Sequence, residues 1–102
     1  MTELKGSQRK FLRGLAHNLN PAAYVGQKGI TEQLIEEINQ ALDASELIKV
    51  KFVDYKDKDV KKALSDEITK AVNAHLAGMV GHVIILYRQH KDTAKRLIKL
   101  PK

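Results

Sequence analysis

The sequence predicts an α/β domain: a two-layer α+β arrangement in the order α-β-α-β-α-β-β, with one mixed four-stranded sheet. Two observations point to it. Three segments repeat apolar residues at the spacing of a helix, and four shorter segments have the composition or the alternation of strands. Because 102 residues suffice for one hydrophobic core but not for two, we expect a single domain over residues 1–89 and a basic tail over 90–102.

The first helix is expected at residues 7–20. Ser7 is a suitable N-cap, and Asn20-Pro21 ends the helix because proline cannot continue it. Its apolar side chains recur at helical spacing and should pack against the domain: Phe11, Leu12, Leu15 and Leu19. The opposite arc should expose the side chains that could contact a polyanion: Arg9, Lys10, Arg13 and His17. His17 could equally complement the negative end of the helix dipole.

A short strand at 22–25 precedes the loop Gly26-Gln27-Lys28-Gly29 and a second helix at 31–44. The acidic outer face of that helix would repel a phosphate backbone. The loop differs, because its glycines allow phosphate to approach the backbone N–H groups and Lys28 adds a positive charge. Two glycines in such a loop can also serve the turn alone, and the sequence leaves both interpretations open.

The second strand, at 47–53, alternates between apolar and basic residues. Its apolar residues should face the core, whereas Lys49 and Lys51 should face outward and form a basic surface. A third helix follows at 59–74, and its solvent side has mixed charge.

The last two strands, at 76–80 and 83–89, are joined by the turn Gly81-His82. The second of them is too apolar for a strand with one wet face, so we expect it to be central and covered on both sides. Right-handed crossovers through the second and third helices make the first three strands parallel, and the final hairpin makes the fourth antiparallel to its neighbour.

Positive charge is concentrated at the two ends of the sequence. The chain has a net charge of +6, made up of +4 over residues 1–29, −3 over 30–87 and +5 over 88–102. Such segregation is typical of proteins that bind a phosphate backbone. A basic surface that only keeps the protein soluble would have the same composition.

The sequence contains no combination of residues that indicates catalysis or a cofactor. There is no Cys, the four His lack the spacing of metal ligands, and neither a Walker A loop nor a dinucleotide fingerprint is present. The N-terminus lacks the apolar core of a secretory signal, and no apolar run is long enough to span a bilayer. We therefore expect a soluble, cytoplasmic protein that is not an enzyme, binds no metal, and has no membrane or small-molecule partner.

Aromatic residues are too few to predict base stacking. Phe11 and Phe52 are expected in the core, and the three tyrosines do not form a pair on adjacent strands. An electrostatic mode of binding to the backbone of a nucleic acid suits the composition better.

Several stretches together resemble the CRM domain family (chloroplast RNA splicing and ribosome maturation), specifically its YhbY-like bacterial members. They occur in the family's order and spacing over nearly the whole chain: Leu15-Ala16-His17 followed by Asn20-Pro21, Val25-Gly26-Gln27-Lys28-Gly29-Ile30-Thr31, Glu46-Leu47-Ile48-Lys49-Val50-Lys51, and Gly81 followed by Leu86-Tyr87-Arg88. One departure is Val72-Asn73-Ala74-His75, where the family commonly has Thr-Gly, and it leaves the end of the third helix open.

The resemblance implies a fold similar to the C-terminal domain of bacterial translation initiation factor three. It also implies binding to large-subunit ribosomal RNA or its precursor, in a pre-ribosomal particle, and a role in ribosome assembly. The family's Gly-x-x-Gly loop is a proposed RNA contact and maps onto Gly26, Gln27, Lys28 and Gly29. The family's basic surface maps onto Lys49 and Lys51, and Arg88 ends the Leu-Tyr-Arg signature.

The expected RNA-binding residues are therefore Arg9, Lys10, Arg13, His17, Gly26, Gln27, Lys28, Gly29, Lys49, Lys51 and Arg88. Two other functions fit the same sequence. A nucleoid-type protein would bind duplex DNA with a similar basic domain, and a protein-interaction module would dock on a ribosomal protein through the basic tail.

Overall fold

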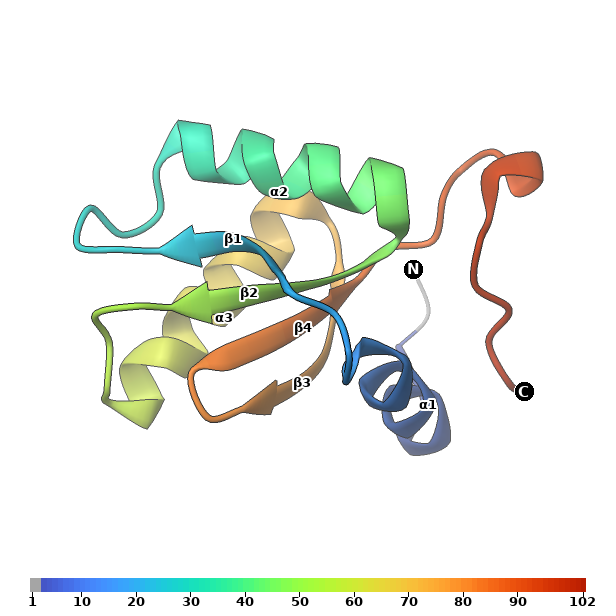
Figure 1. Cartoon of the computed structure of the whole chain (residues 1–102), viewed down its shortest axis with the longest axis horizontal. Helices are drawn as coiled ribbons and strands as arrows, with labels where there is room; N and C mark the ends of the chain where they lie inside the picture. Colours follow the sequence, from blue (N-terminus) through green and yellow to red (C-terminus); the bar gives the residue numbers. More distant parts are fainter. Residues whose placement is uncertain (1–2) are drawn as a thin grey trace.

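The computed structural model describes residues 3–102, so the first two positions of the predicted domain lie outside the described residues. Its elements follow the predicted order (Figure 1). They are α1 (Gly6–Ala16), β1 (Pro21–Val25), α2 (Glu32–Ser45), β2 (Leu47–Phe52), α3 (Lys58–Val72), β3 (His75–Val80), β4 (Val83–Tyr87) and a 3-10 turn at Thr93–Lys95.

The four strands form one mixed sheet in the order β1-β2-β4-β3. β1 and β2 are parallel, and β4 runs antiparallel to both of its neighbours, β2 and β3. The first three strands are therefore parallel and the fourth opposes them, which confirms the predicted topology.

β4 is central and buried on both faces, as its apolar sequence predicts. Ile84 and Leu86 point into the core beneath α2 and α3, whereas Ile85 and Tyr87 point to the second face, where α1 packs. α2, α3 and the sheet form the two predicted layers, and α1 adds part of a third.

β4 ends at Tyr87 instead of Gln89 because Tyr87 pairs with the first residue of each neighbouring strand, Leu47 in β2 and His75 in β3. Beyond Tyr87, neither β2 nor β3 has a further residue that could pair with β4. The other strand ends differ from the predicted bounds by at most one residue.

Backbone conformation determines where the helices end. Thr31 caps α2, with its Oγ1 accepting a hydrogen bond from Leu34 N at 3.1 Å. α3 ends at Val72 because Asn73 takes a left-handed conformation at φ 53°, so the prediction that this helix reaches Ala74 was wrong by two residues. Asparagine tolerates that conformation better than most residues, which explains how the chain turns without a glycine there.

The predicted bounds of the first helix were wrong at both ends. The helix begins at Gly6, and its N-cap is Lys5, whose N–H donates to Gln8 Oε1 at 2.9 Å. It ends at Ala16 instead of Asn20. The four residues that follow turn the chain toward β1, which begins at Pro21.

The buried face of α1 also differs from the prediction. Of the four apolar residues expected to pack, only Leu12 is buried, and Ala16 is its buried partner one turn later. The exposed fractions of Phe11, Leu15 and Leu19 lie between 38% and 45%. No other α-helix of the described residues packs on this face, and α1 buries only the narrow stripe that contacts the sheet.

A buried carboxylate connects the basic tail to the domain. Glu46 lies between α2 and β2 with a positive φ of 61° and is 1% exposed. Its side chain accepts hydrogen bonds from the backbone N–H groups of His90 (2.6 Å), Leu97 (2.6 Å) and Ile98 (3.0 Å). Ile98 and Leu100 then pack on the cluster beneath α1.

Burial alone would raise the pKa of Glu46, but the three N–H donors and the nearby His90 outweigh it, and its pKa lies below the ordinary value. The free energy that this ionised carboxylate contributes is therefore fully present above the ordinary pKa of 4.5 and is lost as the pH falls through the lowered native value.

We expect Glu46→Gln to lower the free energy of unfolding at pH 7 by about 1.5–3 kcal/mol, since hydrogen bonds to a charged acceptor are lost. Denaturant unfolding measures this loss, and hydrogen exchange should show faster exchange at the amides of Leu97 and Ile98. The exposed carboxylate Glu67 provides the control Glu67→Gln. Equal protection of the tail amides in both variants would contradict this role for Glu46.

Candidate nucleic-acid interface

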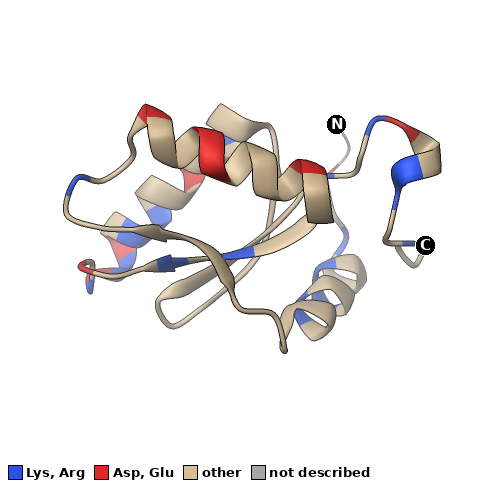
Figure 2. Cartoon of the chain, turned by 45° about the horizontal axis from the view of Figure 1, so that its top comes forward, with Lys and Arg blue, Asp and Glu red and all other residues tan. Residues whose placement is uncertain are grey.

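Charge is distributed unequally between the two sides of the sheet, although α3, on the side of α2, carries residues of both signs. Every Lys, Arg, Asp or Glu in α1 and the four strands is a cation, whereas every such residue in α2 is acidic. Figure 2 shows basic residues on α1, on β2 and on the loop before α2, and acidic residues along α2. Because α1 packs on the face opposite α2 and α3, the side of the sheet that carries α1 is positive.

The loop Gly26–Gly29 is a braced turn. Gly29 N donates to Gly26 O at 3.0 Å, and the Tyr55 hydroxyl donates to the same oxygen at 3.1 Å. Gly29 has a φ of 69°, a conformation that favours glycine. The side chains of Gln27 and Lys28 are exposed at the tip. The turn is thus held from the β2–α3 connection and presents two polar side chains to solvent.

A surface hollow of about 540 Å³ lies beside this loop. Its lining includes two carboxylates, Glu37 and Asp54, together with Tyr24. Acidic groups would repel a phosphate inside the hollow. An anion would therefore meet the loop at its exposed tip, from the side of Gln27 and Lys28.

The two predicted lysines of β2 have different surroundings. The Lys49 ammonium donates to His17 O at 3.0 Å, so it joins β2 to the C-terminal end of α1. Lys51 is exposed farther along the strand, opposite Tyr24 of β1 and Val83 of β4. Lys51 is therefore the more available of the two.

The cations of α1 lie outside the stripe of buried residues that faces the sheet. Arg9 donates to Leu4 O at 2.8 Å, and Arg13 donates to Ala77 O at 3.3 Å. The alkyl chain of Arg13 crosses Gly78 so closely that a Cβ there would lie 2.6 Å from Arg13 Cδ. Lys10 and His17 are exposed. The structure thus brings the α1 cations together with Lys49 and Lys51 on one side of the sheet, with the glycine loop at its end (Figure 1).

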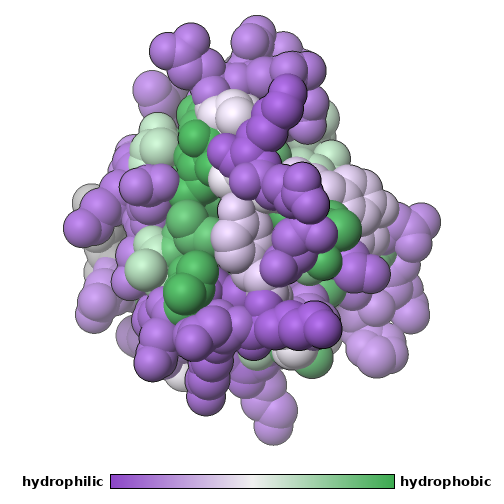
Figure 3. Space-filling view, turned by 90° about the vertical axis from the view of Figure 1, so that its left-hand side faces the viewer, coloured by the Kyte–Doolittle hydropathy of each residue, from purple (hydrophilic) through white to green (hydrophobic). Residues whose placement is uncertain are grey.

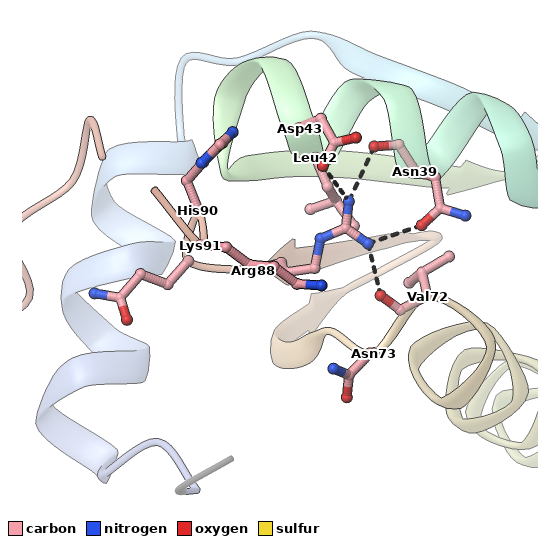
Figure 4. Close-up of a pocket in the computed structure, with 9 residues that line it drawn as sticks. Asn39, Leu42, Asp43, Val72, Asn73, Arg88, His90 and Lys91 are labelled. Atoms are coloured by element: carbon pink, nitrogen blue, oxygen red, sulfur yellow. Dashed lines mark hydrogen bonds and ion pairs between the residues drawn. The ribbon is translucent and has the colours of Figure 1, made fainter. Parts of the chain in front are cut away.

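The Arg88 side chain contacts α2 and α3, on the side of the sheet opposite α1 (Figure 4). Its guanidinium donates to Asn39 Oδ1 (2.7 Å) and Asn39 O (3.1 Å), to Val72 O (2.7 Å) and to Asp43 Oδ1 (2.8 Å). These contacts join the C-terminal parts of α2 and α3 to the end of β4. With its donors engaged in this way, Arg88 holds the helical layer together.

Tyr24 was not among the residues expected from the sequence, although its side chain is 57% exposed on the positive side of the sheet. The alternation of faces along a strand could have indicated that Tyr24 is exposed. In β1 the burial alternates, with Ala23 and Val25 inside and Ala22 and Tyr24 outside. The strand was too short for that alternation to stand out.

The sequence profile of the CRS1 / YhbY (CRM) domain matches residues 4–88. The chain belongs to the CRM domain family. An RNA-binding protein of Haemophilus influenzae is 39% identical over 102 residues, covering 100% of this chain and 99% of the relative. The "Probable RNA-binding protein YqeI" of Bacillus subtilis is 36% identical over 98 residues, covering 96% of this chain and 99% of the relative.

A solved structure has the same fold as this CRM domain. The solution structure of the Staphylococcus aureus protein SAV1595 matches with a TM-score of 0.80 and 36% identity, covering 96% of this chain and 99% of that one. The curated relatives are named as RNA-binding proteins and not as enzymes. Within residues 3–102, no helix is both long and apolar enough to cross a membrane.

We expect Arg88→Lys to destabilise the CRM domain without changing the affinity of the folded protein for RNA. An ammonium cannot reach all the acceptors of the guanidinium, and each polar group left unpaired costs about 1–3 kcal/mol. Urea unfolding measures the loss. The control is Arg96→Lys, because Arg96 is exposed and its side chain donates to one acceptor, His90 O, at 2.8 Å. A variant with wild-type stability but weaker RNA binding would return Arg88 to the interface.

Proposed function

We propose that this CRM domain binds large-subunit ribosomal RNA or its precursor, within a pre-ribosomal particle, and assists ribosome assembly by holding an RNA conformation. One observation carries the proposal. Cations from α1 and β2 gather on the side of the sheet whose helix and strands have no acidic residue, with the Gly26–Gly29 loop at its end. The names of the relatives support RNA as the partner.

Phosphate contacts would supply most of the affinity in this mode of binding. Lys10 and Arg13 on α1, Lys51 on β2 and Lys28 on the loop are exposed. Each phosphate that a cation neutralises releases counterions, and this release drives association. The arrangement recognises the path of a backbone more than a base sequence.

The basic tail extends the same positive surface. Gln8 Nε2 on α1 donates to Pro101 O at 2.9 Å, and the Glu46 contacts hold the tail against the domain. The exposed cation Lys99, two residues before Pro101, would then meet RNA beside the first turn of α1, and Lys95 and Arg96 would meet it farther along the tail. In this proposal the protein acts in the cytoplasm as a binding protein, without catalysis or a cofactor.

We expect the triple variant Lys10→Ala, Lys28→Ala, Lys51→Ala to bind a transcript of large-subunit ribosomal RNA more weakly and with a smaller salt dependence. Each lost contact should reduce the slope of log K against log[salt] by about 0.7–0.9. Filter binding across a salt series measures both quantities. The matched control, Lys58→Ala, Lys62→Ala, Lys70→Ala, removes the same charge from exposed positions of α3.

Equal losses in the two triple variants would show that net charge, and not this surface, governs binding. A duplex DNA competitor as effective as the RNA would instead support the nucleoid alternative. Particle association that survives RNase would support docking on a ribosomal protein.

We expect Gly26→Ala to weaken RNA binding while leaving stability close to wild type. Gly26 has no positive φ, and a Cβ there would come no closer than 3.9 Å to a neighbouring atom, Asp54 Oδ2. A loss of affinity in this variant therefore reports the close approach of RNA to the backbone. Gly29→Ala is the contrasting variant, because its φ of 69° strains any side chain and should lower stability by about 1–2 kcal/mol. Unchanged affinity in Gly26→Ala would leave the loop with its turning role alone.

A further inference from the structure

α1 covers only one end of the second face of the sheet. Its buried residues pack on Leu47, Ala77, Ile85 and Tyr87. At the other end, one row of paired residues crosses all four strands: Tyr24 pairs with Lys51, Lys51 with Val83, and Val83 with Val80. Paired residues share a face, so this row lies on the side of α1 and not on the side of α2 and α3.

Most of these side chains are exposed, and Val83 is half-buried. Tyr24 is 57% exposed and Val80 64%, and Val53, which follows β2 two residues after Lys51, is 57% exposed. We call these five residues the open row: Tyr24, Lys51, Val53, Val80 and Val83. Figure 3 views the molecule from the end that bears the Gly26–Gly29 loop, where hydrophobic side chains reach the surface among hydrophilic ones.

Three features of the open row match a nucleic acid strand. Its apolar and aromatic side chains can contact the faces of bases, and Lys51, between Tyr24 and Val83 in the pairing, can contact a phosphate. No strand of the sheet carries an acidic residue, and the nearest acidic position in the sequence, Asp54, follows Val53 outside the sheet. Tyr24 also lines the hollow beside the Gly26–Gly29 loop, so the open row borders the loop, while Glu37 and Asp54 keep phosphate out of the hollow itself.

We infer that the open row binds an unpaired segment of the RNA, with one base stacked on Tyr24; this inference rests on the proposed function and names the kind of RNA that it requires. A duplex hides the faces of its bases, whereas a single strand exposes them. The row spans three strand spacings, about 14 Å, so it accommodates a short single-stranded stretch. A single stacked base contributes about 1–3 kcal/mol.

The chain contains no tryptophan, so Tyr24→Trp introduces a single indole as a probe at the proposed stacking position. Binding of a single-stranded oligoribonucleotide should quench its fluorescence, and a blunt RNA duplex of the same length should not. Quenching by both RNAs alike, or by neither, would overturn the inference.

Affinity provides the second readout. Tyr24→Ala should weaken binding of the single strand about 5- to 150-fold, the equivalent of one stacked base, while Tyr24→Phe keeps the ring and stays near wild type. The slope of log K against log[salt] should not change, because no charge is removed. Val80→Ala should also weaken binding, whereas Val60→Ala, an exposed valine of α3, should not.

The outcomes separate this inference from the proposed function. If Tyr24→Ala binds the single strand as well as wild type and the lysine variants remain defective, the open row is not a base platform, and the phosphate surface stands. If the wild-type protein binds no RNA, the proposed function fails and the inference fails with it. If particle association of the wild-type protein survives RNase and Tyr24→Ala abolishes it, the open row contacts a protein partner and the inference is overturned.

Discussion

The packing of α1 on the second face of the sheet is the constraint on which the proposed surface depends. Leu12 and Ala16 are fully buried against residues of β2, β3 and β4, and burial of a side chain such as Leu12 stabilises the fold by about 1.5–3 kcal/mol. This narrow contact fixes where the cations of α1 lie. It also leaves the far end of the face without a covering helix, and that end carries the open row.

Two charged side chains support this arrangement from within. Glu46 anchors the tail next to α1 through backbone N–H groups, and Arg88 joins α2, α3 and β4 through its guanidinium. Both belong to stretches that resemble the family. Their geometry assigns them to the framework, while exposed cations elsewhere remain free to meet a ligand. Charged side chains in this domain therefore have two roles: Glu46 and Arg88 stabilise the fold, whereas the exposed cations can bind a ligand.

The two proposals describe complementary parts of one RNA-binding surface. The cations of α1, β2 and the glycine loop suit the backbone of a structured RNA, whereas the open row suits bases that are not paired. A surface with both features would favour a junction between a helix and an unpaired segment. Such junctions are common in folded RNA and are the places where sequence-specific recognition is usual.

The sequence by itself determined the fold class, the order of the elements and the central position of β4, because these follow from local periodicity and from how apolar a strand is. It also located the cations of α1 and β2 and the glycine loop. Only the tertiary structure decided which flank of α1 is buried, that Arg88 lies across the sheet from the other candidates, and that Tyr24 shares a row with Lys51 and two valines. Those facts depend on strand order, on register and on which face a helix covers, and such contacts join residues far apart in the chain that no local pattern relates.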